Sequence, residues 1–444
     1  MKPLISRPIE AFTGTARIPG DKSISHRALI LGALAVGETR VSHLLAGDDV
    51  RRTAAALGAM GVEIDRLADG AWRVRGRGVG GLAEPATVLD LGNSGTGVRL
   101  LMGLAAGHAH LTHFAGDTSL SRRPMGRVAA PLAEMGARIT ARRGDRLPLS
   151  VVGAASLMPI EYTLPVASAQ VKSAILLAAL HAPGRTTVIE PRATRDHSEN
   201  LLARFGAEIA VEDLADGGRA ITLTGQPELE PQAIEVPGDP SSAAFPLVAA
   251  AARPGSRVRL PGVGLNPLRT GLVDCLREMG AEIRVTGTRD SGGEAIADLE
   301  VRGGPLSAIA VPAERAPRMI DEYPILAVAA AVAEGRTEMR GLAELRVKES
   351  DRIAAMAAGL TAAGIAVEEF PDGLAITGTG GARPAGDGRV ETRDDHRIAM
   401  SFLVLGALSE RPVGVDTGAM IETSFPGFVE LMNGLGADIG TEIP

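Results

Sequence analysis

The sequence predicts an α/β protein of two similar domains, each built from three related modules. The first observation is length, because 444 residues exceed what one hydrophobic core usually organises. The second is a pattern, apolar-x-x-apolar-Gly-apolar-x-Ile/Val, which occurs six times with its glycines at Gly61, Gly136, Gly206, Gly280, Gly364 and Gly436. The third is their spacing of 70 to 84 residues, which is too long for a small solenoid repeat and indicates modules with their own helices and strands.

Each copy of the pattern predicts the end of an amphipathic helix, a glycine cap and entry into a strand. In the first copy, Leu57 and Met60 precede Gly61, and Val62 and Ile64 follow it. Glycine is favoured at such a cap because it adopts the left-handed conformation without a steric penalty.

Two chain crossings are expected between the domains. Pro and Gly interrupt an extended run near residues 234–242, which indicates one boundary. A basic motif begins at Gly20, so a second crossing there would join the N-terminus to the C-terminal half. We therefore expect one domain from residues 1–20 plus 238–444 and another from residues 21–237.

Composition excludes several classes of function. Aromatic residues make up 2% of the chain, which leaves few side chains to stack on nucleic-acid bases. The single cysteine, Cys275, allows no internal disulfide and fits a reducing cytoplasm. The longest apolar runs, near residues 174–180 and 325–333, are shorter than a membrane span of about 20 residues. We expect a cytoplasmic protein that binds neither nucleic acid nor membrane.

Lys and Arg nevertheless gather with Gly, Ser, Asn and Asp in five short segments. The net charge is −7, which argues against a general polyanion binder. The segments are residues 20–27, 121–126, 194–198, 346–352 and 393–397. Cations concentrated in this way predict a compact site for one or two small, multiply charged anions.

The first two motifs indicate backbone contacts to an anion. Lys22 and Ser23 are expected at the start of a helix, where unpaired N–H groups and the helix dipole favour negative charge. A capped helix with surface cations is the alternative. Residues 89–99 predict a strand, a glycine-rich turn and a helix, and three glycines would allow a ligand to approach the backbone. The alternative is a plain tight turn.

Two further motifs indicate polar recognition. Arg122 and Arg123 precede what reads as a proline-started helix, and Arg forks suit carboxylate or phosphate. Ser168 and Gln170 are expected on one side of an extended segment, where they could bond hydroxyl groups. The alternative for that segment is a cap followed by a core helix.

The C-terminal half supplies carboxylates as well as cations. Asp321 stands at the start of an apolar helix, where a carboxylate usually stabilises the helix by interacting with the positive end of its dipole. Lys348 and Arg352 are four residues apart and are expected to share one helix face, with Glu349 adjacent; a solvated, salt-bridged face is the alternative. Arg397 is expected at the start of an apolar helix over residues 398–405.

Three other motifs are discounted. Residues 76–81 fit Gly-x-Gly-x-x-Gly, but no long helix follows, so a dinucleotide site is not expected. His108, His110 and His113 lack an accompanying Cys/His cluster, so no metal is predicted. Cys275 reads as a core thiol rather than a nucleophile.

Together the motifs resemble the 5-enolpyruvylshikimate-3-phosphate (EPSP) synthase family over nearly the whole chain. Seven segments carry the resemblance in order: Asp21-Lys-Ser23, Leu91-Gly-Asn-Ser-Gly-Thr-Gly97, Arg123-Pro-Met-Gly126, Arg195-Asp-His197, Pro261-Gly-Val-Gly-Leu-Asn-Pro267, Arg346-Val-Lys-Glu-Ser-Asp-Arg352 and Asp395-His-Arg397. The resemblance implies two domains, each of three βαβαββ units in an inside-out α/β barrel. It also implies a monomer with no metal and no organic cofactor.

The implied reaction transfers an enolpyruvyl group from phosphoenolpyruvate to the 5-hydroxyl of shikimate 3-phosphate and releases phosphate. Each substrate has a carboxylate and a phosphate group of about −1.5 to −2 charge. Seven cations of the motifs would balance this negative charge: Lys22, Arg27, Arg123, Arg195, Lys348, Arg352 and Arg397.

The resemblance also implies a role for each matching position. Residues that would bind shikimate 3-phosphate are Lys22, Ser23, Arg27, Ser168, Ala169, Gln170, Arg195, Asp321 and Lys348. Residues that would bind phosphoenolpyruvate are Lys22, Gly95, Arg123, Gln170, Arg352 and Arg397. Asp321 would take the proton of the attacking hydroxyl, and Glu349 with Lys22 would move protons at the methylene carbon.

Departures from the family pattern and alternatives are also visible in the sequence. Ala169 stands where many relatives have a second serine, and residues 422–426 lack a lysine that another branch uses near phosphoenolpyruvate. Gly95 leaves room for the inhibitor glyphosate, so we expect inhibition. The alternatives are a UDP-N-acetylglucosamine enolpyruvyl transferase, which would need a loop cysteine, and a non-catalytic protein that binds phosphorylated metabolites.

Overall fold

The computed structural model describes residues 3–215 and 217–441, which divide into two compact units. The Lys22 unit comprises Lys22–Val236 and Ser291–Glu294. The Asp321 unit comprises the chain up to Asp21, Pro237–Asp290 and the chain from Ala295 onward. These limits differ from the predicted ranges by one residue at each crossing and by the short return at Ser291–Glu294.

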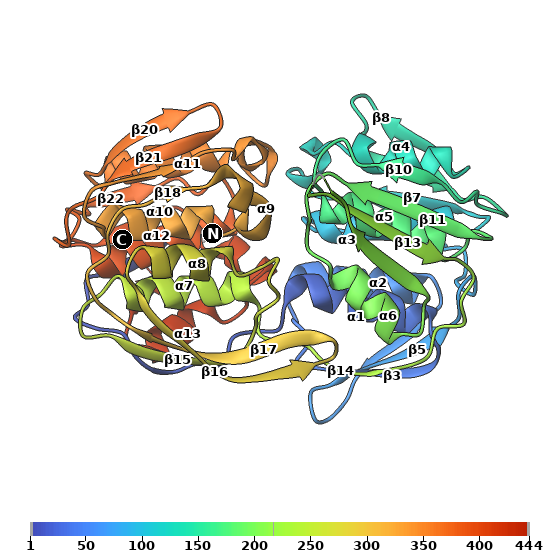
Figure 1. The fold of residues 1–444 in the computed structure, drawn as a ribbon, viewed down its shortest axis with the longest axis horizontal. Coiled ribbons are helices and arrows are strands. Elements are labelled where there is room, and N and C mark those ends of the chain that lie inside the picture. Colours follow the sequence, from blue (N-terminus) through green and yellow to red (C-terminus); the bar gives the residue numbers. More distant parts are fainter. Residues whose placement is uncertain (1–2, 216, 442–444) are drawn as a thin grey trace. The chain divides into compact units, whose positions relative to one another are not determined.

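The Lys22 unit has three four-stranded sheets and six α-helices among the described residues (Figure 1). Its strands are β3 (Val36–Ser42), β4 (Glu63–Arg66), β5 (Trp72–Arg77), β6 (Leu89–Asp90), β7 (Leu111–Ala115), β8 (Arg138–Arg142), β9 (Arg146–Val152), β10 (Glu161–Thr163), β11 (Arg185–Glu190), β12 (Ile209–Asp213), β13 (Arg219–Thr224) and β14 (Ala233–Glu235). Its helices are α1 (Lys22–Leu34), α2 (Asp48–Ala59), α3 (Gly95–Ala106), α4 (Gly126–Glu134), α5 (Ala169–Ala179) and α6 (His197–Arg204), with a 3₁₀ turn, η1, at Leu120–Arg122.

The Asp321 unit repeats this plan with three more four-stranded sheets. Its strands are β1 (Leu4–Arg7), β2 (Thr13–Thr15), β15 (Arg257–Gly264), β16 (Glu282–Ser291), β17 (Glu294–Arg302), β18 (Ala310–Val311), β19 (Arg336–Met339), β20 (Ala366–Phe370), β21 (Gly373–Thr377), β22 (Gly388–Val390), β23 (Val413–Val415) and β24 (Asp438–Thr441). Its α-helices are α7 (Pro240–Ala251), α8 (Gly271–Glu278), α9 (Ala316–Met319), α10 (Tyr323–Val332), α11 (Arg352–Ala362), α12 (His396–Leu408) and α13 (Phe428–Gly434). Its 3₁₀ turns are η2 (Ala313–Arg315), η3 (Ala343–Val347) and η4 (Ala419–Thr423).

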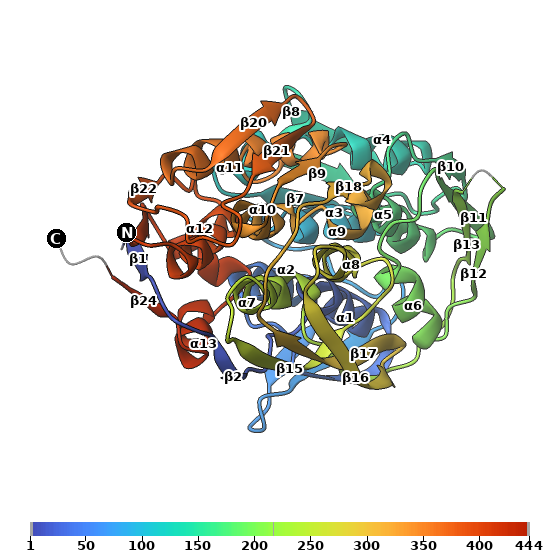
Figure 2. The same ribbon diagram turned by 60° about the vertical axis from the view of Figure 1, so that its left-hand side comes forward.

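All six sheets follow one topology. In each, a parallel pair joins an antiparallel strand, as in β6-β7-β9-β8, where β6 runs parallel to β7 and β9 runs antiparallel to β7. The chain order β6, α3, β7, α4, β8, β9 is the predicted βαβαββ unit. Three sheets take one strand from a distant segment: β14 pairs with β3, β2 with β15, and β1 with β23 and β24. Figure 2 shows β1 beside β24, although they lie at opposite ends of the chain.

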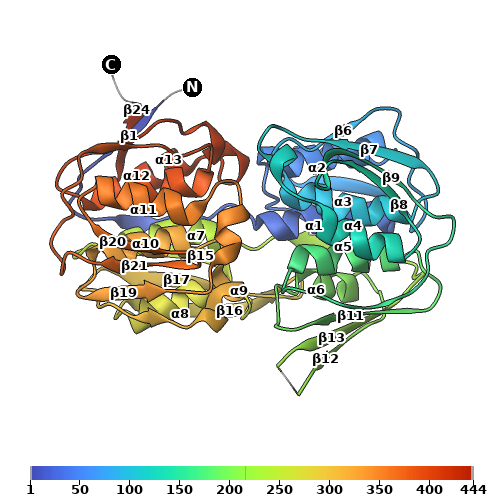
Figure 3. The ribbon, with the colours of Figure 1, turned by 90° about the horizontal axis from the view of Figure 1, so that it is seen from above.

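Three helices in each unit are buried on nearly all sides. They are α1, α3 and α5 in the Lys22 unit and α7, α10 and α12 in the Asp321 unit. Apart from polar residues that lie mostly in their N-terminal halves, their sequences are apolar and as a group rich in Ala, Leu and Val, which is typical of buried helices. Figure 3 shows helices inside each unit and sheets outside, and the strands of the described residues close no barrel. The predicted inside-out arrangement is confirmed.

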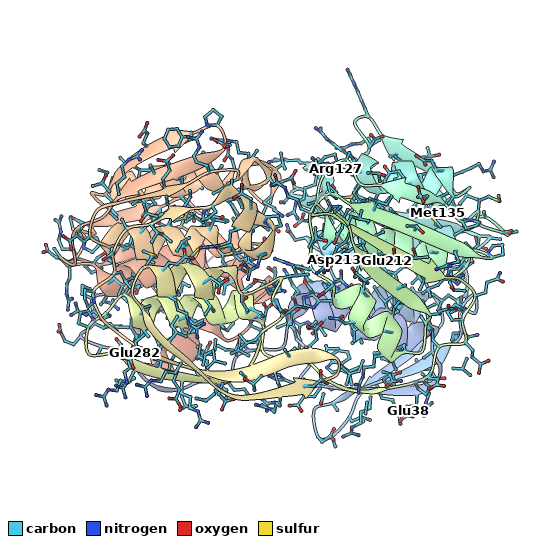
Figure 4. The ribbon with its side chains drawn as sticks, in the orientation of Figure 1. Glu38, Arg127, Met135, Glu212, Asp213 and Glu282 are labelled. Carbon is cyan, nitrogen blue, oxygen red and sulfur yellow. The ribbon has the colours of Figure 1, made fainter. Side chains whose placement is uncertain are left out.

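The outer faces of the sheets are polar. Figure 4 labels Glu38 on β3, Glu212 on β12 and Glu282 on β16, and all three residues are exposed. On β3, Glu38 and Arg40 alternate with the buried Thr39 and Val41, so one face of this strand contacts water while the other packs inward.

The six repeat glycines are confirmed as helix caps. Their φ angles lie between 82° and 110°, in the left-handed region that glycine favours. Gly61 follows α2 and precedes β4, and Gly364 likewise joins α11 to β20. The repeat in the sequence thus marks the same joint in each of the six modules.

Candidate functional site

The predicted anion-binding residues of the Lys22 unit gather at the N-termini of its buried helices. Lys22 and Ser23 begin α1, Gly95 begins α3, and Ser168 caps α5. Side chains link these helix starts, because Gln170 on α5 donates to Thr96 Oγ1 on α3 at 3.0 Å and accepts from Arg99 Nη1 at 3.0 Å. Helix N-termini present free N–H groups and the positive end of a dipole, so this face of the unit favours anions.

Ser168 corrects one prediction. Its φ and ψ are extended, but its hydroxyl accepts from Val171 N at 3.4 Å, and α5 begins at Ala169. Ser168 and Gln170 therefore do not share a side of an extended segment. The alternative, a cap followed by a core helix, is the observed one, because the hydroxyl satisfies an N–H that the first helical turn leaves unpaired.

Arg27 is held in a buried cradle of hydroxyl groups. Its Nε donates to Ser198 Oγ and its Nη2 to Ser173 Oγ, both at 2.7 Å. Its Nη1 donates to the carbonyl of Ser23 at 2.9 Å. These bonds fix the direction of the guanidinium within the cradle.

Gly95 and Arg123 are close neighbours. A Cβ added to Gly95 would lie 3.0 Å from Arg123 Nη1 and 2.9 Å from Arg99 Nη1. Arg123 Nη2 donates to Asn93 Oδ1 at 2.6 Å and to Ser119 Oγ at 3.2 Å. The helix α4 begins at Gly126 rather than at Pro124, so the predicted proline-started helix is wrong. Arg123 instead lies in extended backbone after η1.

Two other predicted cations lie in the same unit. Lys22 Nζ is 3.1 Å from Asp49 Oδ2. Arg195 is half-buried in the segment between β11 and α6, next to Asp196, the residue that precedes α6. Ala169 is half-buried in the first turn of α5.

In the Asp321 unit, Arg352 is the centre of a carboxylate cluster. Its side chain is 1% exposed. Nε donates to Asp395 Oδ2 at 2.9 Å, Nη1 to Asp321 Oδ1 at 3.2 Å and Nη2 to Glu349 Oε2 at 2.5 Å. Burial disfavours the charged guanidinium, but the three carboxylates outweigh burial and raise the pKa of Arg352.

Arg397 adjoins this cluster. Its Nη1 donates to the carbonyl of Asp321 at 3.0 Å and lies 4.0 Å from Glu322 Oε1. Asp395 caps α12 by accepting from Arg397 N at 2.9 Å. The predicted residues Asp321, Glu349, Arg352 and Arg397 are therefore brought together.

Lys348 corrects another prediction. It follows the 3₁₀ turn η3, whereas α11 begins at Arg352, so Lys348 and Arg352 do not share a helix face. The helix starts late because the Asp351 side chain accepts from Ala354 N at 3.0 Å and caps it. Asp351, which stands two residues before the apolar run that begins at Ile353, is the sequence signal that marks this start.

Several partners were not predicted from the sequence. Asn93 and Asp395 accept from the predicted arginines Arg123 and Arg352, and Arg99 donates to the predicted Gln170. Ser173 and Ser198 hold Arg27. Arg269 forms a separate buried network, in which it donates to Asp21 at 3.0 Å, Asp239 at 3.1 Å and Ser241 at 2.8 Å. Asp395 could have been found, since it stands directly before an apolar helix as capping residues do. The others depend on long-range contacts.

In residues 3–215 and 217–441, no cluster of three His, Cys, Asp or Glu side chains is arranged to hold a metal ion. Within the same residues, none of the helices has the length and apolarity that crossing a bilayer requires. Cys275 is buried, as expected of a core thiol.

The chain matches known proteins over nearly its whole length. The family model described as EPSP synthase (3-phosphoshikimate 1-carboxyvinyltransferase) matches residues 6–432. A 3-phosphoshikimate 1-carboxyvinyltransferase of Paramagnetospirillum magneticum is 63% identical over 443 residues, which are 100% of this chain and 99% of the relative. One from Parvibaculum lavamentivorans is 60% identical and covers 98% of this chain and 96% of the relative.

Solved structures agree with this assignment of the fold. An EPSP synthase from Acinetobacter baumannii superposes with a TM-score of 0.88 at 43% identity, covering 99% of this chain and 100% of that one. The enolpyruvyl transferase NikO from Streptomyces tendae has a TM-score of 0.78 at 18% identity over 100% of both chains, which speaks to the fold alone.

Proposed function

This chain belongs to the EPSP synthase family, and on that premise we propose that it is a 3-phosphoshikimate 1-carboxyvinyltransferase. It transfers the enolpyruvyl group of phosphoenolpyruvate to the 5-hydroxyl of shikimate 3-phosphate and releases phosphate. The observation that carries the proposal is the cluster in which Arg352 holds both Asp321 and Glu349, because it combines an anion-binding fork with two carboxylates able to move protons.

Shikimate 3-phosphate is assigned mainly to the Lys22 unit. Its proposed ligands there are Lys22, Ser23, Arg27, Ser168, Ala169, Gln170 and Arg195, and Asp321 and Lys348 of the other unit complete the set. The position of Arg27 supports this assignment, since hydrogen bonds to Ser198 and Ser173 orient a cation that can pair with the phosphate of the substrate.

Phosphoenolpyruvate is assigned to Arg352 and Arg397 of the Asp321 unit together with Lys22, Gly95, Arg123 and Gln170. Arginine forks bind carboxylate and phosphate through two parallel hydrogen bonds. The absence of a side chain at Gly95 lets an anion approach the backbone N–H groups at the start of α3 beside Arg123.

The carboxylates near Arg352 also explain how a base could be supplied. Asp321 and Glu349 share the terminal nitrogens of Arg352, so an anion that takes those nitrogens must displace them. A carboxylate displaced from Arg352 can then accept a proton from the substrate. We assign Asp321 the proton of the attacking hydroxyl, and Glu349 with Lys22 the proton transfer at the methylene carbon.

The chemistry needs no metal or organic cofactor in this assignment, because phosphate is the leaving group and side chains move the protons. Charge that develops at the tetrahedral centre would be stabilised by the arginines and helix N-termini. We expect a monomer that acts in the cytoplasm.

Measurement of phosphate release with both substrates tests the proposal. Asp321→Ala is expected to bind shikimate 3-phosphate with unchanged Kd while turnover falls by about 10²- to 10⁴-fold, the usual contribution of a positioned acid–base group. Asp438→Ala, which removes an exposed partner of Arg7, is the control and should keep full turnover.

The same assays distinguish the proposed function from the two alternatives. A protein that only binds phosphorylated metabolites would release no phosphate in either form, and Asp321→Ala would then bind as the wild type does. Turnover with UDP-N-acetylglucosamine in place of shikimate 3-phosphate would overturn the substrate assignment.

A further inference from the structure

A buried ion cluster in the Lys22 unit is formed by residues that lie close in sequence to the proposed shikimate 3-phosphate ligands. Lys172 on α5 is 3.0 Å from Glu190 Oε2 at the end of β11 and 2.6 Å from Glu199 Oε1 on α6. Lys172 and Glu190 are fully buried. We call these three residues the Lys172 cluster. None of them belongs to the residues proposed above to bind substrate or move protons.

Stability alone is a poor explanation for the Lys172 cluster. Removing a charged group from water costs several kcal/mol, and apolar side chains of similar volume often serve a core equally well. One ammonium also faces two carboxyl groups, and burial raises the pKa of Glu199. A cluster of this kind is better explained by the segments that it holds in place.

The first of these segments leads into Arg195. Glu190 accepts from Thr194 N at 3.1 Å and from Thr194 Oγ1 at 2.7 Å, so residues 190–194 form a loop closed at both ends. Arg195 is the next residue. The ion pair with Lys172 holds Glu190 in place. The position of Arg195 therefore depends on the Lys172 cluster.

The second segment is the cradle of Arg27. Lys172 is followed by Ser173, and Glu199 is preceded by Ser198, and these two serines accept from Arg27 and bond each other at 2.7 Å. The ion pair between Lys172 and Glu199 therefore ties α5 to α6 one residue away from the point where both helices meet Arg27.

We propose that Lys172, Glu190 and Glu199 are positioning residues for shikimate 3-phosphate binding, which act by holding the Arg195 loop and the serine cradle of Arg27. This inference rests on the proposed function. It predicts that damage to the cluster weakens the use of shikimate 3-phosphate while phosphoenolpyruvate and the chemical step are unaffected.

Thr194→Val is the sharpest test. It keeps the size of the side chain and removes only the hydroxyl that donates a hydrogen bond to Glu190. Loss of a hydrogen bond to a charged group predicts a rise in KM for shikimate 3-phosphate of about tenfold. The KM for phosphoenolpyruvate and kcat should not change. Thr187→Val is the matched control, since Thr187 lies on β11 and its hydroxyl bonds Thr222 at 2.9 Å.

Glu190→Gln is the second variant. It keeps an acceptor for Thr194 and removes the charge that faces Lys172, and it should also raise the KM for shikimate 3-phosphate selectively. Thermal unfolding of all variants is measured alongside. The inference is overturned if Thr194→Val leaves that KM unchanged, or if both KM values rise together as Tm falls, as a purely structural role requires.

The wild-type assay separates failure of this inference from failure of the proposed function. Wild-type protein that releases no phosphate from the two substrates overturns the proposed function itself. Active wild type with an unaltered Thr194→Val overturns only the positioning role.

Discussion

Arg352 and Asp395 are buried against each other, with Arg352 Nε donating to Asp395 Oδ2 at 2.9 Å. The same carboxylate caps α12 by accepting the backbone N–H of Arg397 through its other oxygen at 2.9 Å. One aspartate therefore fixes the side chain of one proposed phosphoenolpyruvate ligand and the backbone of another. Because Asp395 engages Nε, the two terminal nitrogens of Arg352 face Asp321 and Glu349.

Asp395→Asn should weaken phosphoenolpyruvate binding. Asparagine can still cap α12, but it removes the charge paired with Arg352. We expect the KM for phosphoenolpyruvate to rise at least tenfold, roughly the effect of a lost charged hydrogen bond, with a lower Tm. Steady-state kinetics and thermal unfolding measure both. Asp416→Asn is the control, since Asp416 accepts from Thr392 at the neighbouring strand end. An unchanged KM would show that Asp395 does not position Arg352.

Gly95→Ala should give a folded enzyme with poor affinity for phosphoenolpyruvate. The new methyl group would lie about as close as 3 Å to Arg123 Nη1 and Arg99 Nη1, which are the ends of flexible side chains. Both can move, so we expect a small change in Tm but a higher KM for phosphoenolpyruvate.

The same substitution bears on inhibition. We expect wild-type protein to be inhibited by glyphosate and Gly95→Ala to be less sensitive, because the methyl group fills space beside Arg123. Inhibition curves at fixed phosphoenolpyruvate measure this. Indifference of the wild type at millimolar glyphosate would contradict the prediction.

Cys275 should be dispensable for turnover. It is buried in α8, its Sγ is 3.1 Å from Arg315 Nη1, and burial raises the pKa of the thiol despite that neighbour. A thiolate is the reactive form, so the native protein should resist thiol reagents until it unfolds. Cys275→Ala should retain kcat and both KM values. Loss of turnover would instead indicate a cysteine-dependent transferase.

Acid should destabilise the Lys22 unit through buried histidines. The His108 and His181 rings pack edge to face with centroids 4.7 Å apart, and burial lowers the pKa of His181 to about 3 and also lowers the pKa of His108. The unfolded chain binds these protons near pH 6.5, so stability is full above that pH and falls as pH decreases toward 3.

His181→Gln removes one of these titrating groups. It should reduce the slope of the unfolding free energy by up to about 1.4 kcal/mol per pH unit between pH 6.5 and 3. Urea unfolding at several pH values measures the slope. His113→Gln is the control, because His113 is exposed. Equal slopes in wild type and His181→Gln would refute the assignment.

Much of the fold could be predicted from the sequence because its signals are local. Gly61 and its five counterparts must sit at left-handed caps, and that requirement is fixed by each residue and its neighbours. The apolar sequence of a helix such as α12 likewise predicts that the helix is buried. The basic motifs predict anion binding from similarly local features, since a helix start carries its own dipole and N–H groups.

The predictions that failed have two causes, which are partners that lie far along the chain and competition between local hydrogen bonds. Placing Lys348 and Arg352 on one helix face was wrong because the Asp351 cap, a choice among competing local hydrogen bonds, delays the helix.

By itself, then, the sequence determined six modules and the chemistry of their helix starts, through steric and dipolar effects that act within a few residues. Only the tertiary structure decided which carboxylates share Arg352, that serines cradle Arg27, and that β1, β2 and β14 complete distant sheets. The pairing of β1, β2 and β14 and the cradle of Arg27 depend on packing between segments far apart in the chain, where the gain of burying apolar surface outweighs any preference of one segment. The carboxylates around Arg352 come from nearer segments, but their meeting depends on how α11 packs with its neighbours.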